Sequence, residues 1–162
     1  MPVETVIEDE RWQALGLAAL SDRAFAAVLA QAGLRPGAFD ATILGCDDAR
    51  IAALNDRFRG KAQPTNVLSW PGADRAPGHP GAVPAPPDPL RDAELGDIAI
   101  AYETCVREAG TQSKSVEDHV MHLLVHGLLH LLGYDHIRDA DASVMEETEI
   151  KILGKMGISD PY

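Results

Sequence analysis

The stretch His119-Val-Met-His-Leu-Leu-Val-His-Gly-Leu-Leu-His-Leu-Leu-Gly-Tyr-Asp-His136 contains five of the six histidines of this 162-residue chain. Its spacing predicts a helix on which His126 and His130 lie one turn apart on the same face. The helix should end at Gly133, because glycine readily takes the left-handed conformation that reverses the chain. This turn can bring His136 back toward the other two imidazoles. The stretch therefore predicts one metal ion held by three histidines.

The spacing His-x-x-x-His-x-x-Gly-x-x-His is similar to the long zinc signature of the metzincins, with Gly127 in place of the glutamate that follows the first histidine. In zinc peptidases that glutamate takes a proton from the metal-bound water, and glycine has no side chain to do so. Three histidines still leave a coordination position for water, as in catalytic zinc sites. Water on such an ion has a pKa near ~7. We therefore expect one hydrolytic Zn²⁺ per chain, bound by His126, His130 and His136.

The other histidines are expected to have different roles. His119 and His122 lie on the same broad face of the helix, where they can orient a ligand or line a cleft. His79 lies in a proline-rich segment and is expected at the surface. A pair of histidines four apart on a helix is often only core packing. The third histidine after the glycine is what favours a metal site.

Three segments resemble one protein family. They are His126-Gly-Leu-Leu-His-Leu-Leu-Gly-Tyr-Asp-His136, Arg59-Gly-Lys-Ala-Gln-Pro-Thr-Asn-Val-Leu-Ser-Trp-Pro71 and Leu95-Gly-Asp-Ile-Ala-Ile100. In this order they are similar to the signature segments of the YbeY family of bacterial single-domain endoribonucleases. The resemblance implies a metal-dependent endoribonuclease, specific for single-stranded RNA, that matures the 3′ end of small-subunit ribosomal RNA and acts in ribosome quality control. It also implies that Arg59 is catalytic and binds substrate at the metal cleft, and that Lys61 binds substrate.

Composition and length favour one soluble domain over residues 1–162. The chain is 46% hydrophobic and 24% charged, as globular proteins are. Its start has no basic or apolar run, and no stretch reaches the ~20 apolar residues of a membrane helix. We therefore expect a cytoplasmic protein without a membrane partner. Cys46 and Cys105 form no Cys-x-x-Cys pair and are expected to be reduced, buried thiols.

The net charge of −11 argues against general nucleic-acid affinity, because binding to phosphates depends largely on Lys and Arg. We expect no DNA partner. An RNA substrate requires a local group of cations, and Arg50, Arg57, Arg59 and Lys61 are close in sequence. Arg50 and Arg57 can equally be solvated residues of a helix.

The expected fold is α/β (α+β), with a small four-stranded mixed sheet packed against about five helices. The resemblance implies a metzincin-like layout with the metal-site helix beneath the sheet. Residues 71–92 are rich in proline and are expected to form an extended or mobile loop. No element is predicted for residues 12–20. The expected strands are 3–9, 39–45, 66–70 and 95–101, and the expected helices are 21–32, 48–59, 102–110, 116–132 and one from Asp139 or Asp141 onward.

Three residues near the predicted ligands have two interpretations each. Asp135 can orient an imidazole or accept a proton, or only form the turn. Tyr134 can stack on a base or pack against the core. Met145 can lie beneath the metal, as in a metzincin, or belong to the core.

The residues themselves support hydrolysis at zinc but do not name the bond. Phosphodiester cleavage needs positive charge at the phosphoryl oxygens, which zinc and Arg59 can share. Hydroxide can attack phosphorus or deprotonate the neighbouring 2′-hydroxyl. Two alternatives remain open: a zinc hydrolase of an amide or peptide, against which Gly127 counts, and a non-catalytic ribosome-associated zinc protein. The oligomeric state is open too.

Overall fold

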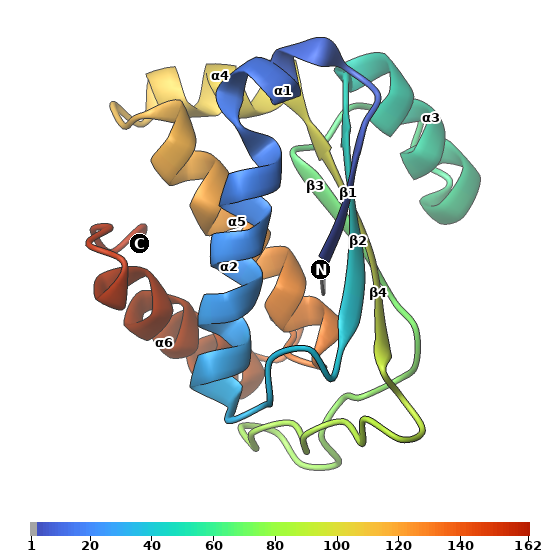
Figure 1. Cartoon of the computed structure of the whole chain (residues 1–162), viewed down its shortest axis with the longest axis vertical. Helices are drawn as coiled ribbons and strands as arrows, with labels where there is room; N and C mark the ends of the chain where they lie inside the picture. Colours follow the sequence, from blue (N-terminus) through green and yellow to red (C-terminus); the bar gives the residue numbers. More distant parts are fainter. Residues whose placement is uncertain (1–2) are drawn as a thin grey trace.

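Four strands form one mixed sheet in the computed structural model, which describes residues 3–162 (Figure 1). The strand order is β1-β2-β4-β3. The first three strands in this order are parallel, and the edge strand β3 runs antiparallel to β4. The predicted four-stranded mixed sheet is thus confirmed. Its strands are β1 (Val3–Ile7), β2 (Asp40–Cys46), β3 (Val67–Pro71) and β4 (Glu94–Ala101).

Six helices complete the described chain, one more than the prediction of about five. None of the helices within residues 3–162 has the length and apolarity that crossing a membrane requires. The helices are α1 (Glu10–Leu15), α2 (Leu17–Ala32), α3 (Asp48–Arg59), α4 (Tyr102–Thr111), α5 (Val116–Leu131) and α6 (Asp139–Lys155).

The prediction of a helix over residues 21–32 was wrong at its start, because α2 begins at Leu17. Ser21 is buried within the helix, and its hydroxyl has no hydrogen-bond partner among the described residues. Gly16, with φ 85°, both ends α1 and precedes α2. The side chains of Trp12 and Leu17 are fully buried. Tertiary packing on both sides of Gly16, and not a capping side chain, therefore sets this boundary.

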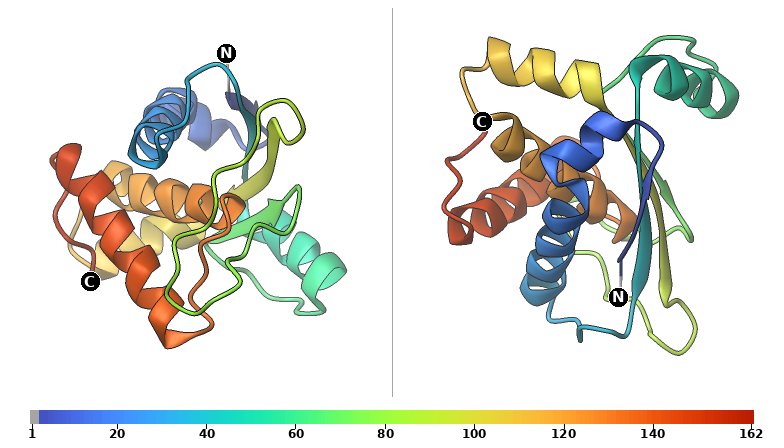
Figure 2. Two further views of the ribbon diagram at one scale, coloured as in Figure 1. Left: turned by 90° about the horizontal axis from the view of Figure 1, so that it is seen from below. Right: turned by 45° about the horizontal axis from the view of Figure 1, so that its top comes forward.

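The helices lie on both faces of the sheet (Figures 1 and 2). Helices α2 and α5 pack on one face, with α6 against both of them. Helix α3 lies on the opposite face, where Ile51 packs with Cys46 and Leu68. Both cysteines are buried free thiols, as expected. Burial raises the pKa of Cys46 to about 12, so this thiol is not a nucleophile at neutral pH.

Helix α5 is the central element, because it contacts α2, α4, α6 and two strands. It begins where the Ser115 hydroxyl accepts a hydrogen bond from the Asp118 backbone amide at 3.1 Å, which satisfies one of the free amides of the first turn. Most of its leucines are buried. A helix enclosed on several sides holds its side chains rigidly, which suits a metal site.

Residues 72–93 form neither helix nor strand. The segment is nevertheless attached to the core at two points. The Arg75 guanidinium donates hydrogen bonds to Asp92 and to the carbonyl oxygens of Leu95 and Leu131. The Gly81 amide donates to Asp141 Oδ1 at 2.9 Å. The predicted loop is therefore irregular but fastened to the end of α5 and to α6.

Candidate metal centre

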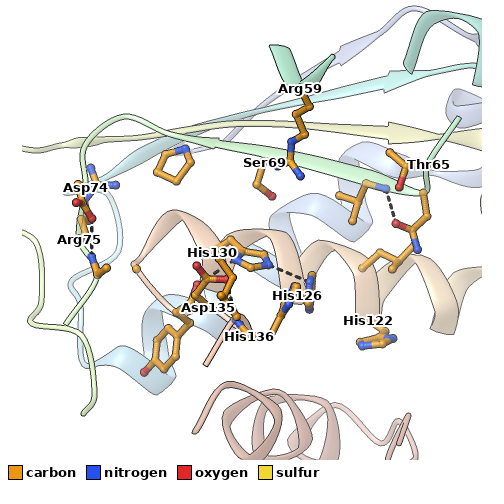
Figure 3. A pocket seen from close by; sticks show the side chains of 18 of the residues that line it. Arg59, Thr65, Ser69, Asp74, Arg75, His122, His126, His130, Asp135 and His136 are labelled. Carbon is orange, nitrogen blue, oxygen red and sulfur yellow. Dashed lines mark hydrogen bonds between the residues drawn. The ribbon is translucent and has the colours of Figure 1, made fainter. Parts of the chain in front are cut away.

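Three histidine side chains converge at the C-terminal end of α5 (Figure 3). His126 and His130 come from successive turns of the helix, and their Nε2 atoms are 3.1 Å apart. The His136 ring stacks on that of His126, with centroids 5.4 Å apart. One nitrogen from each ring lies within 4.8 Å of the other two. These are the three residues that the sequence singles out as ligands.

Hydrogen bonds fix the tautomers of two of the rings. His126 Nδ1 lies 2.6 Å from Glu149 Oε1, and His130 Nδ1 lies 3.0 Å from the carbonyl oxygen of Tyr134. Both partners only accept hydrogen bonds, so in the neutral rings each Nδ1 carries the proton and each Nε2 presents a lone pair. These two lone pairs lie 3.1 Å apart. At this distance they repel unless a metal ion or a proton lies between them.

The three rings fit a zinc-like ion. Ligand nitrogens ~2.0–2.1 Å from a tetrahedral ion are about 3.3 Å from one another, close to the observed 3.1 Å between the two Nε2 atoms. Burial, and then the neighbouring His126 and His136, lower the pKa of His130 to about 4. Its lone pair is therefore available at neutral pH.

Glu149 is the carboxylate that orients His126, and it was not predicted from the sequence. It lies on α6, is fully buried, and also accepts hydrogen bonds from His122 Nε2 at 3.1 Å and the Tyr162 hydroxyl at 2.5 Å. Burial opposes its ionisation, but these hydrogen bonds dominate and lower its pKa to about 2. A buried carboxylate behind a ligand histidine is typical of metal sites. One feature of the sequence could have indicated this role. Glu149 is an acidic residue on the apolar face of a helix, four positions after the buried Met145.

The turn after α5 depends on Gly133. Its φ is 105°, and a Cβ there would lie very close to the Arg75 carbonyl oxygen.

The structure also bears on the three residues with two interpretations each. Asp135 Oδ1 accepts a hydrogen bond from the His136 amide at 2.7 Å, which agrees with its turn-forming interpretation. Tyr134 is half-buried and packs against the core, which agrees with the second of its two interpretations. Met145 also belongs to the buried core.

Gly127 has a structural explanation. Helix α5 packs so closely on the sheet that a Cβ at this position would lie 3.0 Å from Ile98 Cδ1 and 3.1 Å from Ser69 Oγ. At these distances the two side chains would have to shift by a few tenths of an ångström to admit a Cβ. Glycine thus fits the close packing of α5 on the sheet, and the chain lacks the general base of zinc peptidases at this position.

A cleft of about 870 Å³ opens above the histidines. Its opposite wall is formed by β3 and the segment before it, including Thr65 and Ser69. Arg59, the last residue of α3, extends from above into the cleft toward Ser69 (Figure 3). Arg75 also lines the cleft, but its charge is paired with Asp92.

The other predicted cations do not reach this cleft. Lys61 is exposed and is not among the lining residues. Arg50 forms an ion pair with Glu8 at 3.3 Å, and the Arg57 guanidinium lies over the Phe58 ring. The structure thus brings only Arg59 of the four to the histidine site.

The remaining three histidines lie in different surroundings. His122 lines the cleft next to His126. His119 is buried away from it, with Nε2 2.8 Å from Glu108 Oε1. The same carboxylate oxygen accepts a hydrogen bond from Asn66 Nδ2 at 3.1 Å, so His119 supports the wall of the cleft from behind. His79 is exposed and lies outside the cleft lining.

A mixed four-stranded sheet with three converging histidines on its central helix and the following turn defines an α/β protein with a candidate three-histidine metal site. A family model described as Endoribonuclease YbeY matches residues 5–157. The chain belongs to this family.

Individual relatives agree with the family match. Proteins named Endoribonuclease YbeY from Ruegeria pomeroyi and Cereibacter sphaeroides are 56% and 58% identical to this chain, and the alignments cover 100% and 99% of it and 98% of each relative. The protein of that name from Methylocella silvestris is 43% identical over 99% of this chain and 85% of its own length. The solution structure of a Thermotoga maritima protein, 20% identical, has a TM-score of 0.56 and covers 98% of this chain and 97% of its own. At this identity the likeness concerns the fold alone.

Proposed function

We propose that the protein is a zinc-dependent endoribonuclease that cleaves single-stranded RNA and acts in the cytoplasm on ribosomal RNA, at the 3′ end of the small-subunit RNA and in ribosome quality control. The observation that carries the proposal is the pair of Nε2 lone pairs that face each other beside His136. Membership of the YbeY family supports the reaction type and the RNA substrate. We further propose that residues 1–162 act as a single domain and hold one ion through His126, His130 and His136.

The bound ion would supply an acidified water molecule and positive charge next to the scissile phosphate. Every other contribution comes from the chain. Glu149 and the Tyr134 carbonyl hold the His126 and His130 rings with Nε2 toward the cleft.

Arg59 is the residue that we assign to the phosphate. Its guanidinium enters the cleft from the wall opposite the histidines, and it can donate two parallel hydrogen bonds to phosphoryl oxygens. These contacts strengthen as negative charge develops in the transition state. Lys61 lies outside the cleft and would contact RNA that extends beyond it.

The test combines metal analysis of the purified protein with cleavage of a single-stranded RNA, its duplex form and a peptide library, each with and without chelator. We expect about one zinc per chain, chelator-sensitive cleavage of the single strand, and no cleavage of peptides. Cleavage of peptides but not RNA would replace the proposal with an amide hydrolase. Zinc-loaded protein that binds ribosomes and cuts neither substrate would make the metal structural. In cells lacking the protein, small-subunit RNA with an extended 3′ end should accumulate.

A further inference from the structure

The cleft poses a problem of affinity for RNA. The chain has a net charge of −11. Apart from the proposed zinc ion, the cleft has one cation, Arg59, without a carboxylate partner among the described residues. Contacts from Lys and Arg to phosphates therefore contribute less to the binding free energy than in a basic RNA-binding protein. Proteins that hold single strands also use base stacking on aromatic rings, which contributes ~1–3 kcal/mol per base.

Two tyrosines line the described part of the cleft, and only one of them, Tyr162, is exposed. Tyr134 packs against the core. Tyr162, in the segment after α6, is 58% exposed. A free aromatic surface is thus available at the end of the cleft where His122 lies.

The Tyr162 ring is held in place. Its hydroxyl donates a hydrogen bond to the buried Glu149 at 2.5 Å. Its ring meets that of His122 edge to face, with centroids 5.6 Å apart. A ring fixed in this way loses little conformational entropy when a ligand binds.

We propose that Tyr162 binds the RNA substrate by stacking on one unpaired base within one or two nucleotides of the scissile phosphate. The inference rests on the proposed function and adds a substrate contact to it. His122 is one helical turn from the ligand His126, with ring centroids 6.3 Å apart, which places Tyr162 beside the reacting phosphate and not at it. The contact also favours single strands, because bases in a duplex have both faces covered by their neighbours.

Tyr162→Phe and Tyr162→Leu are the matched test variants. Both lose the hydroxyl that bonds to Glu149, but only phenylalanine keeps an aromatic face. On an unstructured oligoribonucleotide with one cleavage site, we expect the kcat/KM of Tyr162→Leu to be about 5- to 100-fold below that of Tyr162→Phe, mainly through KM. Equal losses in both variants would assign Tyr162 to positioning Glu149 alone, and parent-like kinetics in both would remove it from the substrate site. Either result overturns the proposal.

A second measurement starts from the parent protein and uses a variant only in its second step. A set of oligonucleotides carrying one abasic nucleotide at successive positions should show, with the parent protein, one position near the cut where KM rises. That position should lose its effect in Tyr162→Leu. A uniform response across positions, or an unchanged response in Tyr162→Leu, would contradict stacking.

Failure of this inference can be told from failure of the proposed function. Metal content and thermal stability are measured for each protein alongside cleavage. Parent protein that cleaves RNA while both Tyr162 variants behave alike refutes stacking and leaves the endoribonuclease intact. Zinc-loaded parent protein that cleaves no RNA refutes the proposed function, and stacking with it.

Discussion

Histidines 126, 130 and 136 differ sharply from histidines 119 and 122, although all five come from one short stretch. In the first group, the Nδ1 atoms of His126 and His130 donate to oxygen acceptors and leave their Nε2 lone pairs facing each other. In the second group, the Nε2 atoms pair with Glu108 and Glu149, and the Nδ1 atoms are buried without a hydrogen-bond partner among the described residues. The hydrogen-bond partner of each ring nitrogen, and not helical spacing alone, thus decides which histidine can bind an ion.

His122 is an instructive borderline case. Together with His126 and Glu149 it forms a second cluster whose possible ligand atoms lie within 4.8 Å of one another. Hydrogen bonds at 3.1 Å and 2.6 Å already join both rings to the carboxylate. Protons therefore occupy the positions that an ion would need, and Glu149 acts as the support of the neighbouring site.

Removing a ligand should have the largest effect. We expect His126→Ala, His130→Ala and His136→Ala each to lose more metal affinity than the roughly 10–100-fold cost of losing a hydrogen-bond partner of a ligand, with RNA cleavage abolished. Metal analysis after dialysis and a cleavage assay measure both. The matched control is His79→Ala, because His79 is exposed outside the cleft. Near-stoichiometric zinc in all three ligand variants would refute the assignment.

Substitutions of Arg59 test the cleavage reaction separately from metal binding. Within residues 3–162 no hydrogen bond joins Arg59 to a histidine, so Arg59→Ala should keep metal content and thermal stability while cleavage falls by order 10²-fold or more. Arg59→Lys should restore only part of the rate, because a point charge cannot form the two-pronged contact.

Lys61→Ala is the control for Arg59, since Lys61 is exposed outside the cleft. It should weaken RNA binding modestly and in a salt-dependent manner. Metal-loaded Arg59→Ala protein that cuts at the parent rate would remove Arg59 from the site.

A smaller effect is expected from Glu149→Gln. An amide in place of the carboxylate weakens the hydrogen bond that orients His126, so metal affinity should fall roughly 10–100-fold while the fold is retained. Competition with a chromogenic chelator measures the affinity. Glu147→Gln, an exposed site on the same helix, should leave it unchanged. Equal affinities in the two variants would mean that Glu149 does not support the site.

The smallest effect on the metal is expected from His119→Ala. This variant should retain zinc and lose about 1–3 kcal/mol of stability, because the Glu108 hydrogen bond is lost.

The same variant should change how stability depends on pH. Burial lowers the pKa of His119 below its usual value, so the unfolded chain binds more protons than the folded one as the pH falls below ~6.5. The parent is therefore destabilised on acidification through this histidine. The variant should show a shallower fall in stability between about pH 7 and 5, measured by denaturant unfolding. Loss of zinc in His119→Ala would place this residue in the site.

Much of the fold could be predicted because its signals are local. The expected helix bounds agree with the structure where caps and glycines set them. Helix α3 lies between the Asp47 cap and Gly60, α2 ends before Gly33, and α5 begins after the Ser115 cap. The first two helices were missed or misplaced around Gly16, where the burial of Trp12 and Leu17 decides the boundary. Side-chain caps act within a few residues and are visible in the sequence, whereas burial depends on elements far along the chain.

The same division applies to the site. The sequence by itself determined the three converging histidines, because helical periodicity and one glycine act over eleven residues. Only the tertiary structure decided what surrounds them. Packing of α6 on α5 brings Glu149 behind His126 and Tyr162 to the cleft, and close packing on the sheet favours glycine at position 127. These contacts join residues distant in the chain, and no local pattern encodes such distances.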